Sequence, residues 1–424
     1  MKTLRRIAGA VVGQLRTVPA VNRWYARTRS RLYERTVAGF IRDGSGRANR
    51  LPTGIVYEST MRCNLHCEFC YVGDLLNIEG EWRQEMPIET IRRAFPDCDG
   101  LQVNLTGGEI FMRKDIMEVL DLFAQKNYVC GYLTTNGTII DDERADALAD
   151  LALRGFLRHI SVSIDGPGEL HDAARGVKGT FERTAAGLRR LQEAARRKAA
   201  PLRVSINTTV AAESLRSLDS MADVAEELGV DAIGLNHLMF ATPEEAEQTA
   251  RMLGAPDTSV IATFVTPDPG MDATIVAAQV LALQEKCRKK GIRFDFRPKV
   301  WPTIVQNYYR PGTPLLGRCL YPFLHARVGF SGKVYFCPFI RIEVGDLATS
   351  SLEEIWNSPR YVELRKLLLE RKLFPVCRRC CKVELSPQAV PASDVLPQRR
   401  RVIALTRVDN AGTPVPPDGD GVGA

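Results

Sequence analysis

The run Arg62-Cys63-Asn64-Leu65-His66-Cys67-Glu68-Phe69-Cys70-Tyr71 places three cysteines in a C-x3-C-x2-C spacing, directly after the apolar segment Gly54–Ser59. Three thiolates this close together can hold three irons of a [4Fe–4S] cluster, and with no fourth ligand nearby one iron stays open for chemistry. The alternative is a structural zinc site, which needs four ligands in a closed tetrahedron. His66 is next to Cys67 in the sequence and is badly placed to complete one.

The cysteine content fits metal binding better than disulfide bonding. The chain has 424 residues, enough for one large domain or two to three ordinary ones, and it contains 11 cysteines. Several of them fall in C-x2-C spacings, whereas disulfide frameworks are typical of small secreted chains. We therefore expect metal ligation in a reducing compartment, the cytoplasm.

Short apolar runs alternate with helical patterns between about residues 53 and 240. Strands that alternate with helices indicate βαβ units and a parallel sheet. Six such units predict an α/β fold built on a partial (β/α)6 TIM-type barrel. The expected strands are Gly54–Ser59, Leu101–Thr106, Val129–Thr134, His159–Ile164, Val204–Val210 and Ala232–Asn236. The expected helices lie near Ile88–Phe95, Lys114–Lys126, Asp142–Arg154, Thr180–Arg197 and Ser214–Leu228.

Polar residues recur where these strands end, which is where barrels of this kind carry their active sites. The second strand ends in Thr106-Gly107-Gly108-Glu109, and glycines let a backbone approach a ligand closely. The third ends in Thr134-Thr135-Asn136-Gly137, and the fifth contains Asn207-Thr208-Thr209. In the fourth, period-two alternation puts Ser161, Ser163 and Asp165 on one face. Asp165-Gly166 alone also reads as an ordinary turn.

The cysteine run and the Gly107-Gly108-Glu109 motif, in register with the strand pattern, resemble the radical SAM superfamily. The resemblance implies that Cys63, Cys67 and Cys70 hold a [4Fe–4S] cluster whose open iron binds the amino and carboxylate groups of S-adenosylmethionine (SAM). One electron from the cluster then cleaves SAM to a 5′-deoxyadenosyl radical. Glu109 would accept the methionine amino group, and Ser163 and Asn207 would contact the ribose or the carboxylate. The implied SAM-binding set also includes Tyr71, Thr106, Gly107, Gly108 and Asn136.

A second group of cysteines lies near the C-terminus. The spacing Cys319-x12-Gly332-x4-Cys337, followed by Cys377-x2-Cys380, resembles the SPASM module that holds auxiliary clusters in many radical SAM enzymes. No cysteine follows Cys381, so the resemblance is to the shortened "twitch" form with one auxiliary [4Fe–4S] cluster. Cys319, Cys337, Cys377 and Cys380 would be its ligands, with Cys381 as an alternative to Cys380. Four cysteines also suit zinc, which stays open as an alternative.

The remaining cysteines bear on how a substrate radical is resolved. Loss of an electron and a proton gives oxidation, gain of a hydrogen atom from a thiol gives epimerisation, and attack on a neighbouring atom gives a rearrangement. Cys130 lies on the expected third strand and is a candidate hydrogen-atom donor if its side chain faces the lumen. The preferred reading is a plain buried strand cysteine.

The sequence does not fix the substrate. Peptide-modifying members of the superfamily often carry a winged-helix domain for the leader peptide, and residues 1–50 are too short and too arginine-rich for one. We therefore expect a small biosynthetic intermediate, such as a sugar, cyclitol or lipid-linked compound, and an external electron donor such as flavodoxin or ferredoxin. Peptide or protein side-chain modification of the RiPP-maturase type is the second reading. A non-catalytic iron–sulfur electron carrier is the third.

The N-terminal segment is strongly basic. Residues 1–50 carry twelve Lys or Arg and two acids, whereas the whole chain is at +7, so the rest sums to about −3. The pattern predicts amphipathic helices that either cap the barrel or attach peripherally to anionic lipid. No nucleic-acid motif accompanies the charge, and no run approaches the ~20 apolar residues of a membrane span. The expected domains are 1–50, 51–240 for the barrel, 241–316 as a helical linker and substrate-lining region, 317–385 for the auxiliary cluster, and 386–424 as a disordered tail.

Overall fold

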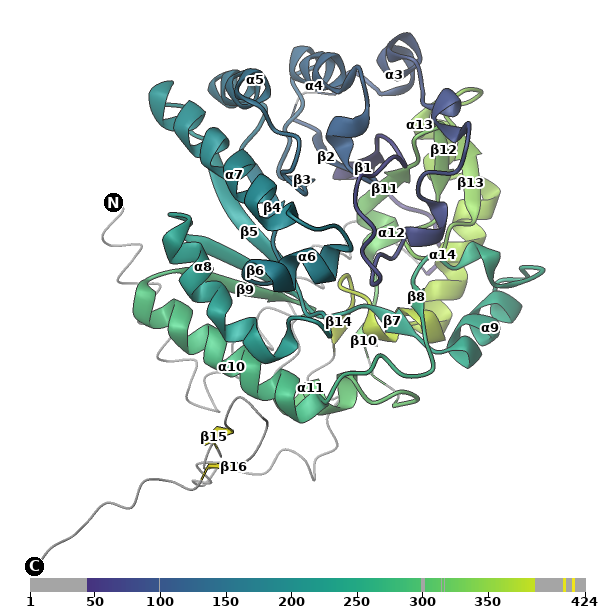
Figure 1. The fold of residues 1–424 in the computed structure, drawn as a ribbon. Coiled ribbons are helices and arrows are strands. Elements are labelled where there is room, and N and C mark those ends of the chain that lie inside the picture. The colour runs from purple at the N-terminus through teal and green to yellow at the C-terminus, as the bar shows by residue number, and fades with distance from the viewer. Residues whose placement is uncertain are drawn as a thin grey trace, which may run out of the picture. The chain divides into compact units, whose positions relative to one another are not determined.

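A computed structural model describes residues 44–98, 100–298, 302–313, 315 and 317–385, together with the short pairs 407–408 and 414–415. The described residues up to 385 belong to one compact unit (Figure 1). Strands β15 (Arg407–Val408) and β16 (Pro414–Val415) pair with each other in a second unit. The expected basic N-terminal helices and nearly all of the tail lie outside the described residues. Among the residues that are described, no helix is long and apolar enough to cross a membrane.

One sheet of ten strands forms the centre of the first unit, in the order β13-β12-β11-β1-β2-β3-β4-β5-β6-β9. From β11 to β9 every neighbouring pair is parallel, and β12 and β13 extend the sheet antiparallel. The strands are β1 Gly54–Glu58, β2 Gln102–Thr106, β3 Leu133–Thr135, β4 His159–Ser163, β5 Arg203–Thr209, β6 Ala232–Asn236, β9 Arg293–Arg297, β11 His325–Val328, β12 Lys333–Tyr335 and β13 Glu343–Asp346.

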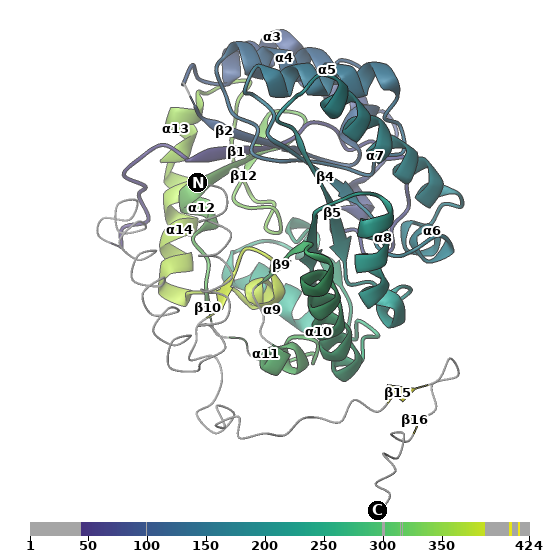
Figure 2. The ribbon, with the colours of Figure 1, turned by 90° about the vertical axis from the view of Figure 1, so that its left-hand side faces the viewer.

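Helices cover the outer face of the curved sheet (Figures 1 and 2). Those between the barrel strands are α3 Ile88–Ala94, α4 Ile116–Gln125, α5 Asp142–Leu153, α6 Glu169–Arg175, α7 Thr180–Arg197, α8 Met221–Glu227 and α10 Ala273–Lys290. The others are α9 Pro243–Met252, α11 Pro302–Tyr308, α12 Tyr321–Leu324, α13 Leu352–Trp356 and α14 Pro359–Arg371. Two-residue strands pair outside the main sheet, β7 Phe240–Ala241 with β8 Phe264–Val265 and β10 Gly317–Arg318 with β14 Glu384–Leu385.

The partial barrel expected from the sequence is confirmed, and the structure extends it at both edges. All six expected strands occur and pair in chain order. Beyond the six expected strands, Arg293–Arg297 forms β9 within the region expected as a helical linker, and it pairs in parallel with β6. At the other edge β11 pairs in parallel with β1, with Gly54 opposite His325. The C-terminal cysteine region is therefore built onto the same sheet as the barrel.

Apolar and polar side chains alternate along the strands, so that the barrel lumen is lined by polar side chains. In β4, Ile160 and Val162 are fully buried, whereas Ser161 and Ser163 line a cavity inside the barrel. The same alternation in β5, β6 and β9 brings serine, asparagine, glycine and arginine to the lumen. Closed TIM barrels instead fill their interior with Val, Ile and Leu. The apolar core here lies between sheet and helices, and the lumen stays open.

Strand β3 is shorter than expected, and this removes Cys130 from the lumen. Val129 and Cys130 form only isolated bridges, and β3 proper begins at Leu133. The break falls at Gly131, where a Cβ would lie 2.4 Å from Nε2 of Gln102. Cys130 is fully buried, its thiol contacts the carbonyl of Tyr132 at 3.4 Å, and it does not line the cavity. The condition for Cys130 as a hydrogen-atom donor, a side chain that faces the lumen, is therefore not met, and the buried-cysteine reading agrees with the structure.

Candidate active site

The three cysteines of the C-x3-C-x2-C run lie on the loop that follows β1, and all three line the cavity. Asn77 fixes the start of this loop, because its Oδ1 accepts from the Cys63 N–H and its Nδ2 donates to the Cys63 carbonyl, both at 2.9 Å. At the other end the Cys70 N–H donates to the Cys67 carbonyl at 3.2 Å. The loop therefore presents three half-buried thiols to one space.

These thiols suit a cluster better than a single ion. Burial raises the pKa of Cys63 to about 12 and also raises the pKa of Cys70, so bound metal would have to drive their deprotonation. Within the described ranges, no group of three or more His, Cys, Asp or Glu side chains is arranged to hold one metal ion. Zinc requires its ligands within about 2.3 Å of a single point. A [4Fe–4S] cluster spreads its cysteines around several irons, so the donor set fits the cluster.

The glycine pair after β2 packs against the cysteine loop. The Gly108 N–H donates to the Thr60 carbonyl at 2.9 Å, and the Glu109 N–H donates to the Arg62 carbonyl at 2.8 Å. A Cβ on Gly107, whose φ is +147°, would lie 2.2 Å from the Thr60 oxygen. One on Gly108 would lie 2.3 Å from the Arg62 oxygen. Side chains here would therefore push the two loops apart.

This contact gives a direct prediction for Gly108→Ala. We expect a destabilisation of about 1–3 kcal/mol from overpacking, with a displaced cysteine loop that loses iron from the first cluster. Iron content and unfolding free energy, measured under anaerobic conditions, test it. The matched control is Gly73→Ala in the same region, where a Cβ meets only Cys70 Cβ at 3.7 Å. If both variants keep the wild-type iron content, the close approach has no such role.

Glu109 is a buried carboxylate held at the ends of β2 and β3. Its Oε1 accepts from Thr135 Oγ1 at 2.8 Å and from the Phe111 N–H at 3.2 Å. Its Oε2 accepts from the Asn136 N–H at 2.6 Å. Burial raises the pKa of Glu109 despite these hydrogen bonds. A cationic ligand group at this point would favour the ionised carboxylate, which fits the expected partner, a methionine amino group.

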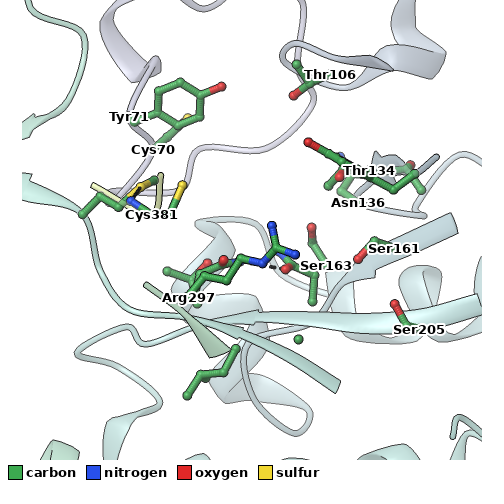
Figure 3. Close-up of a pocket in the computed structure, with 18 of the residues that line it drawn as sticks. Cys70, Tyr71, Thr106, Thr134, Asn136, Ser161, Ser163, Ser205, Arg297 and Cys381 are labelled. Carbon is green, nitrogen blue, oxygen red and sulfur yellow. Dashed lines mark hydrogen bonds between the residues drawn. The ribbon is translucent and has the colours of Figure 1, made fainter. Parts of the chain in front are cut away.

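The structure brings the other expected cofactor residues to the same cavity, whose volume is about 730 Å³ (Figure 3). Asn207 Oδ1 accepts from Asn236 Nδ2 at 2.7 Å, and Asn136 Nδ2 donates to Asn64 Oδ1 at 2.9 Å. The hydroxyl of Tyr71 accepts from Arg327 at 3.0 Å. The expected residues that line the cavity are Cys63, Cys67, Cys70, Tyr71, Thr106, Gly107, Gly108, Glu109, Asn136, Ser163 and Asn207.

Two buried ion pairs support the walls of this cavity, and the sequence analysis missed both. Arg175 pairs with Asp165 at 2.6 Å and points a second nitrogen at the Cys67 thiol, 3.7 Å away. Asp165 is fully buried and also accepts from the Thr209 N–H at 2.7 Å. It does not line the cavity as Ser161 and Ser163 do, since β4 ends at Ser163. Its function is to anchor Arg175 beside the cysteine loop.

The second pair joins the barrel to the C-terminal region. Glu58, the last residue of β1, is fully buried and contacts Arg327 of β11. The same carboxylate pairs with Arg341 at 2.9 Å. The two arginines offset the burial cost of the carboxylate and hold the pKa of Glu58 below its usual value. Glu58 therefore forms ion pairs with arginines that are almost 300 positions away in the sequence.

The C-terminal cysteines form a separate group behind the cavity wall. Cys319 follows β10, Cys337 follows β12, and Cys377 and Cys380 lie on and after the 3-10 helix Pro375–Arg379. Burial raises the pKa of Cys319 to about 12 and that of Cys337 to about 11, and it also raises the pKa of Cys377 and Cys380. None of these four lines the cavity, whereas Cys381 does. Cys380 thus lies outside the cavity lining with the other three cysteines of this group, and it stays the proposed fourth ligand with Cys381 as the alternative.

The segment that carries these cysteines is tied to the body by Arg379. Its buried guanidinium pairs with Glu245 at 3.1 Å and donates to the carbonyls of Tyr308 at 2.7 Å and Arg310 at 2.8 Å. Neither this anchor nor Lys382, which also lines the cavity, was singled out from the sequence.

The chain has three cysteines on the loop after β1 and a second group of four cysteines near its C-terminal end. This arrangement is typical of an iron–sulfur protein with two metal sites. The chain matches the model of the radical SAM superfamily over residues 57–225 and that of the SPASM iron–sulfur cluster-binding domain over residues 319–381. It therefore contains a radical SAM domain and, towards its C-terminal end, a SPASM iron–sulfur domain. These domains imply a SAM-binding [4Fe–4S] cluster and an auxiliary cluster, as expected from the cysteine spacing.

Curated relatives have names that refer to different products. The AdoMet-dependent heme synthase of Oleidesulfovibrio alaskensis is 25% identical over 322 residues, covering 72% of this chain and 75% of that protein. The antilisterial bacteriocin subtilosin biosynthesis protein AlbA of Bacillus subtilis is 28% identical over 187 residues, covering 44% of this chain and 39% of that protein. The structure of Streptococcus suis SuiB bound to S-adenosylmethionine has the same fold, with a TM-score of 0.52 and 16% identity over 74% of this chain and 68% of that chain.

Proposed function

We propose that this protein cleaves SAM reductively and takes a hydrogen atom from a C–H bond of a small biosynthetic intermediate held in the barrel. An external one-electron donor of the flavodoxin or ferredoxin type supplies the electron. The observation that carries the proposal is the polar lumen. It is continuous with the cysteine loop and measures about 730 Å³, within the 300–1,000 Å³ usual for small-molecule sites.

The chain's own residues prepare the site. When bound, the cluster supplies the electron that splits SAM, and the adenosyl fragment takes the substrate hydrogen. Cys63, Cys67 and Cys70 would hold that cluster, and Glu109 would receive the methionine amino group through its buried carboxylate. Ser163 and Asn207 offer hydrogen-bonding groups from adjacent positions on β4 and β5 to the ribose or the carboxylate.

Peptide modification is the second candidate, because a relative is named for bacteriocin biosynthesis. That match covers less than half of either protein, whereas the match to the heme synthase covers most of both. The longer match and the internal position of the cavity favour a small molecule. The substrate then undergoes oxidation, epimerisation or rearrangement.

Deuterium transfer tests the proposal. The anaerobically reconstituted protein would receive SAM, a reductant and deuterated cell extract split into polar, peptide and lipid fractions. We expect deuterium in 5′-deoxyadenosine with the polar or lipid fraction and none with the triple variant Cys63→Ala, Cys67→Ala, Cys70→Ala. Deuterium in 5′-deoxyadenosine with the peptide fraction would establish peptide modification instead. Absence of 5′-deoxyadenosine with every fraction would favour an electron carrier.

A further inference from the structure

Cationic side chains dominate the charges that line the cavity. Glu109 and Asp295 are the lining carboxylates among the described residues. Glu109 is engaged by two N–H groups and a hydroxyl, and Asp295 has a partner of its own. Three lining arginines have carboxylate partners behind the wall or at the rim, namely Arg175 with Asp165, Arg327 with Glu58 and Arg293 with Asp231.

Arg203, Arg297 and Lys382 line the cavity without such a partner, since none of the three makes an ion pair in the part of the chain that is described. Arg203 begins β5, at the opposite end of the parallel strands from Arg297. Arg297 is the last residue of β9, opposite Asn236 of β6, and its side chain reaches into the cavity (Figure 3). Lys382 comes from the auxiliary segment, directly after Cys381. Its ammonium lies 5.9 Å from the ring centre of Tyr321. The two cations therefore enter one space from the barrel and from the SPASM region.

The thiol of Cys381 is the strongest electrostatic neighbour of Lys382, and Arg297 acts on both of these groups. Like charges that face one space repel each other, and solvent screens part of this repulsion because Arg297 is exposed and Lys382 is half-buried. An anion between them would turn the repulsion into attraction. A planar guanidinium can bind a carboxylate or phosphate with two parallel hydrogen bonds, and a lysine adds a compact point charge.

We propose that Arg297 and Lys382 bind an anionic oxygen group of the substrate, a carboxylate or a phosphate, between β9 and the auxiliary segment. This inference rests on the proposed function, since it defines the class of small molecule that the cavity accepts. It adds a specificity site that draws on both domains. The substrate's anionic end would lie between the two cations, and its body would lie in the polar lumen.

Equilibrium dialysis of the reconstituted protein under saturating SAM tests the proposal with matched probes. The probes are 2-naphthoate, 2-naphthyl phosphate and the neutral methyl 2-naphthoate. Both anions should bind more tightly than the ester, and their relative affinities distinguish a carboxylate site from a phosphate site. Arg297→Gln and Lys382→Gln should each weaken anion binding about tenfold or more, because each removes a charge-assisted contact. Binding of the ester should be unchanged.

Arg203→Gln is the matched control. Arg203 also lines the cavity, but it begins β5 at the opposite end of the parallel strands from Arg297. We expect this variant to bind both anions within about twofold of wild type, since it lies outside the contact distance of direct hydrogen bonds. Iron content is measured for every variant and should stay at the wild-type value.

Several results would overturn the inference. Equal affinity for anions and ester would do so, as would anion binding that survives both substitutions. Anion binding that occurs only without SAM would assign the cations to the SAM carboxylate. Loss of auxiliary iron in Lys382→Gln with anion binding intact would make Lys382 a counter-ion of the cluster. 5′-Deoxyadenosine is measured in the same preparations, so anion binding without SAM cleavage would reject the proposed function and leave the anion site standing.

Discussion

The triple variant Cys63→Ala, Cys67→Ala, Cys70→Ala should abolish SAM cleavage and still retain about half of the bound iron. The three cysteines lie on one loop that lines the cavity, whereas the four C-terminal cysteines lie apart from it. Removal of the first group should therefore reduce iron from about eight to about four per chain, if each group holds one [4Fe–4S] cluster. Iron and sulfide analysis of the anaerobically reconstituted protein measures this independently of activity.

The reciprocal variant Cys377→Ala, Cys380→Ala should lose the other half of the iron and keep the open-iron cluster. Cys98→Ala is the matched control, because Cys98 is exposed and does not line the cavity. It should retain all of the iron. Complete loss of iron in the triple variant would mean that the C-terminal cysteines hold no cluster of their own. Zinc in place of iron in that variant would establish the structural-zinc alternative for them.

The parts of the site that could be predicted are those encoded by local sequence. Cys63, Cys67 and Cys70 share one loop, and Gly107-Gly108-Glu109 directly follows a strand, so spacing alone brings them to the same end of the barrel. Period-two alternation placed Ser161 and Ser163 on one face, and both line the cavity. The run Arg293-Phe294-Asp295-Phe296-Arg297 carries the same alternation. Its place in the sheet as β9, beside β6, is known only from the structure.

Contacts between distant segments could not be predicted from one sequence. Nothing local indicates that β11 pairs with β1, or that Glu58 meets Arg327 and Arg341 across the intervening chain. Whether Cys130 faces the lumen also depends on such a contact. Its strand pattern continues through Gly131, but Asn104 Oδ1 accepts from the Tyr132 N–H at 3.2 Å, and this side-chain contact replaces strand pairing where the β-strand is interrupted. The orientation of the thiol depends on that tertiary contact.

The second large effect is expected from Glu58→Gln, which should lower the free energy of unfolding by about 3–5 kcal/mol. The change is nearly isosteric, so no cavity is created. It leaves Arg327 and Arg341, which are 4% and 9% exposed, without their counter-ion. Arg327 also hydrogen-bonds Tyr71 beside the cysteine loop, so the damage should reach both metal sites. Denaturant unfolding of the reconstituted protein gives the stability, and iron content reports on the sites.

A surface pair and a rescue separate this explanation from a general loss of charge. Lys333 and Glu343 join β12 to β13 at 2.9 Å, but both side chains are more than 40% exposed. Glu343→Gln should therefore cost less than about 1 kcal/mol. Adding Arg341→Met to Glu58→Gln should recover part of the stability, because it removes one of the two unpaired buried cations. If the double variant is less stable than Glu58→Gln alone, the guanidinium of Arg341 stabilises through packing on Tyr335, whose ring centre lies 4.1 Å away, and the ion pair contributes little.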